Sequence, residues 1–339
     1  MNDIDGRGRL IVIGASAGGV QAISRLLGAL PPELDAAICI TTHISAHTPS
    51  VFHKILASKT RMSVLPAVHG DPLRRGTVYT AVPDRHLMVT DRTIRLTRGP
   101  KESRARPAVD VLFRSAAMSF GPRAIGVILS GMLDDGTAGS WAIKDQQGVV
   151  LVQDPAEASY PSMPQSVLQH VQVDFTGAVP ALADEIVRLC SEPAPGPAAP
   201  SAFQRHELEN RIAGEENALQ GGVMELGKMS QFTCPDCHGV LVQIEEGSIL
   251  RFRCHTGHAF SIKSLVVEVG ESIDIGLWDT IRALEERVLL LRQMSHFAAG
   301  QHAADMAEQS LRQAEHIDRH IQTLRELVMD PDIFGHTPQ

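Results

Sequence analysis

The first 190 residues alternate short apolar runs with amphipathic segments. Three of the apolar runs, Leu10–Ile13, Ala37–Thr42 and Ala124–Ser130, are apolar along their length, as expected of strands covered on both faces. The other two strand candidates are Val78–Ala81 and Val149–Gln153. Strands that alternate with helices predict an α/β fold with a doubly wound, mostly parallel sheet. Leu87–Leu96 alternates apolar and polar residues and predicts a hairpin or an antiparallel edge.

The remaining chain divides by composition. Residues 192–202 contain four prolines among small residues and predict a linker. We therefore expect an α/β domain over 8–191, a polar helix followed by a small cysteine-containing module over 203–262, and a helical hairpin over 263–331.

The hairpin prediction rests on apolar residues at four-three spacing on either side of Gly300. The first set is Leu277, Ile281, Leu284, Val288 and Leu291, and the second is Ile317, Ile321, Leu324 and Val328. This pattern is typical of coiled-coil helices. The two helices either pack on their own domain or present a surface to a regulatory partner.

Composition narrows the class of protein. The net charge of −8 and the lack of a long basic run argue against nucleic acid as a partner. No apolar stretch is long enough to predict a membrane span, and the acidic start is unlike a secretory signal. Five unevenly placed cysteines fit a reducing compartment better than a disulfide framework, so we expect a cytoplasmic protein.

A serine flanked by small residues follows the first predicted strand. Gly14, Ser16 and Gly18 meet the pattern G-x-S-x-G, at the place where a helix is expected to begin. Such a turn can present a nucleophilic hydroxyl or can bind phosphate at the helix N-terminus. A dinucleotide-binding turn requires glycine where Ser16 stands, and the second strand ends in His43 rather than an acid, so the nucleophile is the stronger interpretation.

A base and an acid are available at matching positions. His43 ends the second strand candidate, 27 positions after Ser16, which is about one strand-helix-strand unit. If these strands are neighbours, both residues lie at the same carboxyl edge of the sheet. Asp134 and Asp135 follow the strand Ala124–Ser130, and spacing does not choose between them. A Ser-His-Asp hydrolase is therefore predicted.

Several motifs in order then resemble the catalytic domain of the CheB-type chemotaxis receptor methylesterases. These motifs are Ile13–Gly19, His43, Gly76–Tyr79, Pro83–Leu87, Arg106–Asp110, Leu129–Gly136, Gln153–Pro155 and Met163–Pro164. The resemblance covers residues 10 to about 190 and implies hydrolysis of glutamyl methyl esters, with deamidation of glutamines as a related activity, on chemoreceptor-type signalling proteins. It implies no catalytic cofactor.

By motif, the resemblance makes Ser16 the nucleophile, His43 the general base and Asp135 the acid, with the Met132 amide stabilising the oxyanion. Ala17 stands where many relatives have threonine. Familiar members carry a receiver domain ahead of the esterase, whereas this sequence starts almost directly at the first strand. We therefore expect the esterase activity to be controlled by a route other than phosphorylation of a receiver domain in the same chain.

The cysteine cluster predicts a structural metal site. Cys234 and Cys237 form a C-x-x-C knuckle, and 16 residues separate it from Cys254 and His258. This is the pattern of a zinc ribbon, with Val240–Ile244 and Ile249–Phe252 as its hairpin. His258 is the preferred fourth ligand; His255 and His238 are alternatives.

The sequence thus predicts a protein-glutamate methylesterase whose C-terminal extension controls access to Ser16. The alternative is a signalling adaptor that keeps the esterase fold and acts mainly through its zinc and helical module.

Overall fold

A computed structural model describes residues 4, 8–45, 50–193, 203–215, 217–301, 303–330 and 333. The chain divides into two compact units, Met1–Ser264 and Leu265–Gln339. Most of the predicted linker, residues 194–202, lies outside the described residues. No helix formed by the described residues combines the length and apolar character that crossing a membrane would need.

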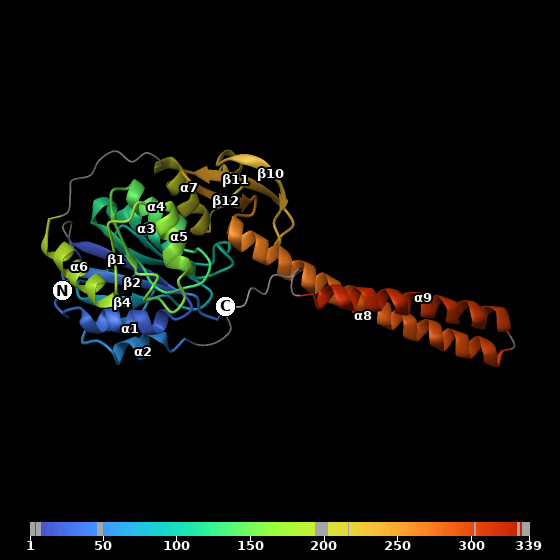
Figure 1. The fold of residues 1–339 in the computed structure, drawn as a ribbon. Coiled ribbons are helices and arrows are strands. Elements are labelled where there is room, and N and C mark those ends of the chain that lie inside the picture. Colours follow the sequence, from blue (N-terminus) through green and yellow to red (C-terminus); the bar gives the residue numbers. More distant parts are fainter. Residues whose placement is uncertain are drawn as a thin grey trace. The chain divides into compact units, whose positions relative to one another are not determined.

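The first unit is built on a seven-stranded sheet in which every neighbouring pair is parallel (Figure 1). The strand order is β3-β4-β2-β1-β7-β8-β9. The strands are β1 (Arg9–Ala15), β2 (Ala36–Thr42), β3 (Ser63–Pro66), β4 (Thr77–Thr80), β7 (Ala124–Ile128), β8 (Val149–Gln153) and β9 (Phe175–Gly177). The predicted doubly wound, mostly parallel sheet is confirmed, and the short strands β3 and β9 are additions to the prediction.

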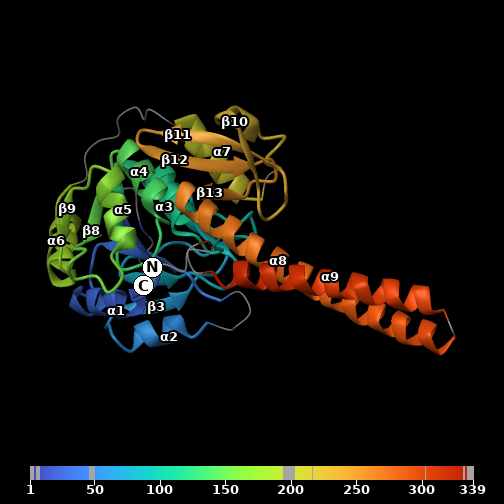
Figure 2. The ribbon, with the colours of Figure 1, turned by 45° about the vertical axis from the view of Figure 1, so that its right-hand side comes forward.

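Helices cover both faces of this sheet, and each face has its own apolar core (Figure 2). On one side lie α1 (Gly19–Ala29), α2 (Phe52–Ala57) and α6 (Val179–Ser191). On the other lie α3 (Val109–Phe120), α4 (Thr137–Asp145) and α5 (Ser162–His170), and a short 3-10 turn, η1 (Gly121–Arg123), follows α3. All residues of β1 and β2 are buried, which explains why their sequences are apolar throughout.

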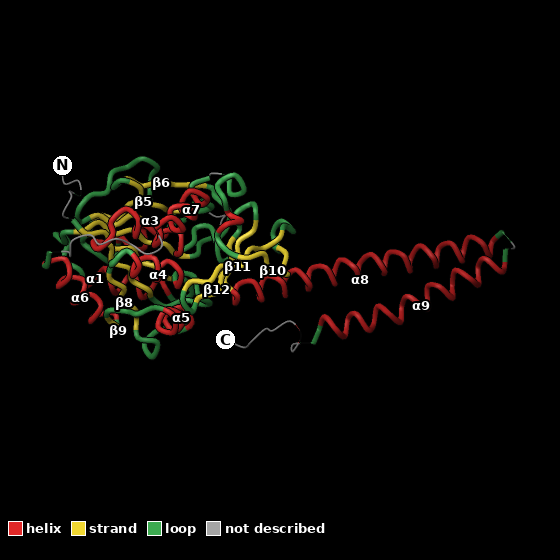
Figure 3. Tube along the Cα trace, turned by 90° about the horizontal axis from the view of Figure 1, so that it is seen from above, coloured by secondary structure: helices red, strands yellow, loops and turns green. Residues whose placement is uncertain are grey.

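The predicted hairpin at Leu87–Leu96 is present as an antiparallel pair, β5 (His86–Thr90) and β6 (Thr93–Thr97). It forms a separate two-stranded sheet that packs beside α3 (Figure 3).

The cysteine-containing segment forms a second sheet within the first unit. Its four antiparallel strands are β10 (Lys228–Thr233), β11 (Val240–Glu246), β12 (Ile249–Cys254) and β13 (Ala259–Ser261). Helix α7 (Phe203–Ala213) and the 3-10 turn η2 (Val223–Glu225) share a small apolar core with this sheet. We call residues 203–264 the module.

A buried cluster of charges joins the module to the larger sheet domain. Arg253 of β12 donates hydrogen bonds to Glu102 and to Glu209 of α7, both at 2.9 Å. Glu102 also accepts from Arg114 of α3 at 2.8 Å, and Glu209 accepts from Arg251 at 2.8 and 3.0 Å. Burial alone would raise the pKa of Glu209, but Arg251, Arg114 and Arg253 outweigh burial and hold that pKa well below its ordinary value.

Helix α7 is the predicted polar helix, but two of its polar residues are not exposed to solvent. Its Glu209 and His206 are fully buried. His206 packs its ring against Trp141 of α4. Glu209 can be buried on this face of α7 because Arg251 and Arg253, which are distant in sequence, neutralise its charge.

The second unit contains the predicted helical hairpin. Helix α8 (Ile262–Gly300) begins in the first unit and continues into the second, where α9 (Ala304–Val328) runs antiparallel to it. Their shared core contains eight of the nine predicted apolar residues, namely Ile281, Leu284, Val288, Leu291, Ile317, Ile321, Leu324 and Val328. Leu277 is not part of this core. Leu290, Met294 and Phe297 of α8 are exposed. A partner at these helices stays a prediction.

The charge cluster yields a stability prediction. Replacing Arg253 with alanine leaves Glu102 and Glu209 buried with one cation fewer, so we expect a loss of about 3–5 kcal/mol in the free energy of unfolding of the first unit. Chemical denaturation followed by the fluorescence of Trp141, in proteins that carry Trp278→Phe, measures this loss.

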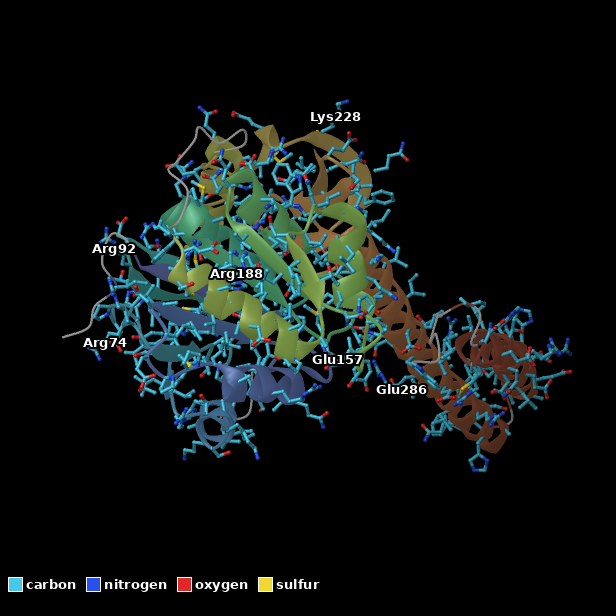
Figure 4. All side chains as sticks on the ribbon, turned by 60° about the vertical axis from the view of Figure 1, so that its left-hand side comes forward. Arg74, Arg92, Glu157, Arg188, Lys228 and Glu286 are labelled. Carbon is cyan, nitrogen blue, oxygen red and sulfur yellow. The ribbon has the colours of Figure 1, made fainter. Side chains whose placement is uncertain are left out.

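The matched control is Arg188→Ala on α6. Arg188 pairs with Glu185 and Glu192 at the protein surface, where solvent screens the ion pairs (Figure 4). The control should leave the unfolding midpoint nearly unchanged. Equal effects of the two substitutions would contradict the assigned role of the buried cluster.

Candidate active site

Three neighbouring strands bring the predicted catalytic residues to one edge of the sheet. Strands β2, β1 and β7 are adjacent, and Ser16, His43 and Asp135 follow their carboxyl ends. Connections from β1 lead to β2 on one side, whereas β7 leads to β8 on the other. The site therefore lies at the point where the strand order reverses, the usual position for sites in open α/β sheets.

The turn after β1 fixes Ser16. Its amide donates to the Ser130 carbonyl at 3.0 Å, and its carbonyl accepts from the Gly19 amide at 2.9 Å. Gly18 has a φ of 71°, and a Cβ there would lie 2.7 Å from the Ser130 hydroxyl. Glycine is required at this position because both the backbone conformation and the close approach exclude a side chain.

His43 connects the serine to the acid. Its Nδ1 lies 3.0 Å from Ser16 Oγ, and its Nε2 lies 2.8 Å from Asp135 Oδ2. A neutral ring that carries its proton on Nε2 donates to the carboxylate and leaves the Nδ1 lone pair to accept from the Ser16 hydroxyl. The His43 side chain is 30% exposed and that of Asp135 only 2%, so the reactive end of the chain of hydrogen bonds faces solvent.

The first turn of α3 holds the Asp135 carboxylate. Oδ2 accepts from the Val109 amide at 2.7 Å, and Oδ1 accepts from the Asp110 amide at 2.9 Å. The free amides and the dipole at a helix N-terminus stabilise an anion there. These two backbone hydrogen bonds orient the Asp135 side chain toward His43.

Asp110 makes the reciprocal contact with α4. Its Oδ1 accepts from the amides of Gly136 at 2.9 Å and Gly139 at 2.7 Å. Burial, and then the charge of Asp135, raise the pKa of Asp110 well above its ordinary value. The sequence interpretation assigned no role to Asp110, although the residue lies in a motif of the family resemblance.

The structure separates the two adjacent aspartates. Asp135 contacts His43, whereas Asp134 accepts a hydrogen bond from Ser261 Oγ at 2.7 Å. Leu133, which directly precedes the two aspartates, has a φ of 60°. Met132 is exposed at the same loop, and none of the described residues accepts a hydrogen bond from its amide.

The four predicted metal ligands also lie together. Cys237 and Cys254 Sγ are 3.6 Å apart, and His258 Nδ1 is 3.7 Å from Cys234 Sγ and 3.6 Å from Cys254 Sγ. Two sulfurs bound to one zinc at 2.3 Å with a tetrahedral angle would lie about 3.8 Å apart. The ligand atoms therefore fit a tetrahedral ion.

His255 and His238 are not members of this group among the described residues. Instead, the His255 ring packs against Gly239. The hydrogen bond with Cys254 raises the pKa of His258 to about 9. A bound cation would replace that shared proton.

Comparison with known proteins agrees with the fold of the sheet domain. The sequence profile of the CheB methylesterase family matches residues 11–186. A protein-glutamate methylesterase/protein-glutamine glutaminase of Methanosarcina mazei is 36% identical over 188 residues, covering 53% of this chain and 51% of that protein. A Leptospira interrogans relative is 34% identical over 180 residues, which are 53% of this chain and 93% of the relative. This chain thus spans about half the length of the first of these relatives.

A solved structure is similar as well. The CheB methylesterase catalytic domain of Thermotoga maritima superimposes with a TM-score of 0.52 at 28% identity, covering 54% of this chain and 98% of that domain. The module and the helical hairpin lie outside the region matched by the family profile.

The contact between Asp110 and Asp135 generates a prediction about pH. The pKa of Asp110 in the folded state lies above 3.8, its ordinary value. Protonation of Asp110 therefore stabilises the folded state below pH 3.8, and this stabilisation is lost as the pH rises through the raised pKa. Asp110→Asn keeps an oxygen for Gly136 and Gly139 but removes the charge. The free energy of unfolding of the variant, relative to wild type, should therefore increase as the pH rises above 3.8.

Urea denaturation of both proteins across a series of pH values measures this difference. A difference that stays constant with pH would contradict the assigned burial of the Asp110 charge.

Proposed function

The chain belongs to the CheB methylesterase family, and from this membership we propose that it hydrolyses glutamyl methyl esters on chemoreceptor-type signalling proteins. The observation that carries the proposal is the continuous hydrogen-bonded series Ser16–His43–Asp135 at the carboxyl edge of the sheet. The relatives named above also support deamidation of glutamine side chains as a second activity of the same site.

In the proposed reaction, Ser16 Oγ attacks the ester carbonyl carbon while its proton passes to His43 Nδ1. Asp135 stabilises the resulting imidazolium through Nε2. The Met132 amide, which has no acceptor among the described residues, is available to donate to the oxyanion of the tetrahedral intermediate. His43 then returns the proton to the departing methoxide, and methanol leaves.

Water completes the reaction by the same route. His43 takes a proton from the water as it attacks the glutamyl ester of Ser16, and the carboxylate product leaves when the serine recovers its proton. An amide substrate would release ammonia in place of methanol. None of these steps uses a cofactor.

The partly exposed position of His43 favours a protein substrate, because a side chain carried on a large surface must reach the site. The alternative function, a signalling adaptor, would not need the three groups to be held in hydrogen-bonding geometry. We infer a cytoplasmic location from the three cysteines of the module, which lie together without a disulfide.

Replacing Ser16 with alanine should abolish methanol release. The variant lacks the nucleophile but keeps the fold, because the backbone bonds of this turn do not use the hydroxyl. Radiolabelled methanol released from methylated receptor measures the activity, and Ser24→Ala, whose hydroxyl bonds only within α1, is the matched control. Full activity in Ser16→Ala would exclude the mechanism.

We further propose that Cys234, Cys237, Cys254 and His258 hold a structural zinc ion. Four protein ligands leave no open position for a substrate, so the ion would stabilise the module. Protein purified without chelator should contain about one zinc per chain. Cys237→Ser should lower both zinc content and melting temperature, whereas Cys190→Ser, outside the cluster, should preserve the zinc. Absence of zinc from the wild-type protein would contradict the site.

A further inference from the structure

We propose that Ser261 of the module is a positioning residue for the esterase site. Its Oγ donates a hydrogen bond to Asp134 Oδ1 at 2.7 Å, and Asp134 is bonded through the chain to Asp135. Ser261 lies far outside residues 11–186, the region that the family profile matches. The inference rests on the proposed function, because it concerns the acid of the proposed triad.

The loop that carries Asp134 needs support from outside. Leu133 has a φ of 60°, in the left-handed region that is unfavourable for a residue with a side chain. Asp134 is 9% exposed, and its burial raises the pKa of the carboxyl, whereas the hydrogen bond from Ser261 lowers it. Without that donor, the carboxylate is stabilised best by turning toward water. Such a movement would displace Asp135 and the Met132 amide, which belong to the same loop.

The module holds Ser261 firmly in place. Ala259 pairs with the segment 101–103 of the sheet domain: the Ser103 amide donates to the Ala259 carbonyl at 2.8 Å, and the Ala259 amide donates to the Lys101 carbonyl at 3.1 Å. That segment is anchored through Glu102 to the buried arginines, and it leads toward the first turn of α3. The module therefore supports both sides of Asp135, the loop before it and the helix end that binds it.

Ser261 has a second, purely structural role. Its Oγ accepts from the Ser264 amide at 3.0 Å, and the Ser264 hydroxyl accepts from the Ser261 amide at 2.9 Å, which is a reciprocal cap at the start of α8. Among the described residues, Ser264 bonds to Ser261 and not to Asp134. Ser264→Ala therefore weakens the cap alone, whereas Ser261→Ala weakens the cap and also removes the hydrogen bond to Asp134.

The rate at which a fluorophosphonate probe labels Ser16 tests the proposal in the full-length chain. Ser261→Ala should slow the labelling about tenfold, since small displacements of catalytic groups cost this much or more. Methanol release should show the same fall in kcat with KM nearly unchanged. Ser261→Thr, which keeps the hydroxyl, should recover most of the rate, and Ser264→Ala should stay near the wild-type rate.

A double-mutant cycle tests the route. If Ser261 acts through Asp134, Asp134→Ala should slow labelling by itself, and adding Ser261→Ala to it should cause little further loss. Wild-type labelling in Ser261→Ala, an equal loss in Ser264→Ala, or additive losses in the cycle would each overturn the proposal. If the probe labels the wild-type enzyme but the enzyme releases no methanol from methylated receptor, the proposed substrate is refuted. The labelling rates would still decide the role of Ser261.

Discussion

The exchange of backbone hydrogen bonds between Asp110 and Asp135 is the constraint on which the site depends. Asp135, which precedes α4, accepts hydrogen bonds from the first amides of α3. Asp110, which lies in α3, accepts hydrogen bonds from the amides of Gly136 and Gly139 at the start of α4. Two buried acids are tolerated side by side because two helix ends supply positive potential and free donors. The sheet sets the spacing between Ser16 and His43. The hydrogen bonds at the two helix N-termini then place the Asp135 carboxyl within reach of the His43 imidazole.

Much of this arrangement was predictable from the sequence because it follows from local pattern. The apolar runs predicted the buried strands, and neighbouring strand ends predicted that Ser16 and His43 would meet. The choice between Asp134 and Asp135 required the contacts of the two side chains with Ser261 and His43, which spacing does not reveal. The role of Asp110 depends on amides more than 25 residues away, so no local pattern identifies it. The edge strands β3 and β9 are too short to show a clear periodicity.

The module is attached by charge as well as by apolar packing. Three arginines and three glutamates, Arg114, Arg251, Arg253, Glu102, Glu209 and Glu246, are almost fully buried and neutralise one another. Such clusters add little net stability compared with apolar contacts, because removing charges from water is costly. They do make docking specific, since any other orientation would leave a buried charge without its partner. The burial of polar residues on helix α7 has no local signal in the sequence, because the arginines that neutralise Glu209 come from β12 and α3.

The same charge cluster limits how independently the two parts of the first unit can change. Glu102 and Arg114 belong to the sheet domain, while Arg253 and Glu209, which complete their environment, belong to the module. An esterase domain that lacks Glu102 would leave Arg253 of the module without one of its two buried carboxylate partners. Separating the two parts at the proline-rich segment would likewise expose Glu102 and Arg114, which are buried in the intact unit. The proline-rich segment marks a boundary in the sequence, but the buried charges make the two parts one compact unit.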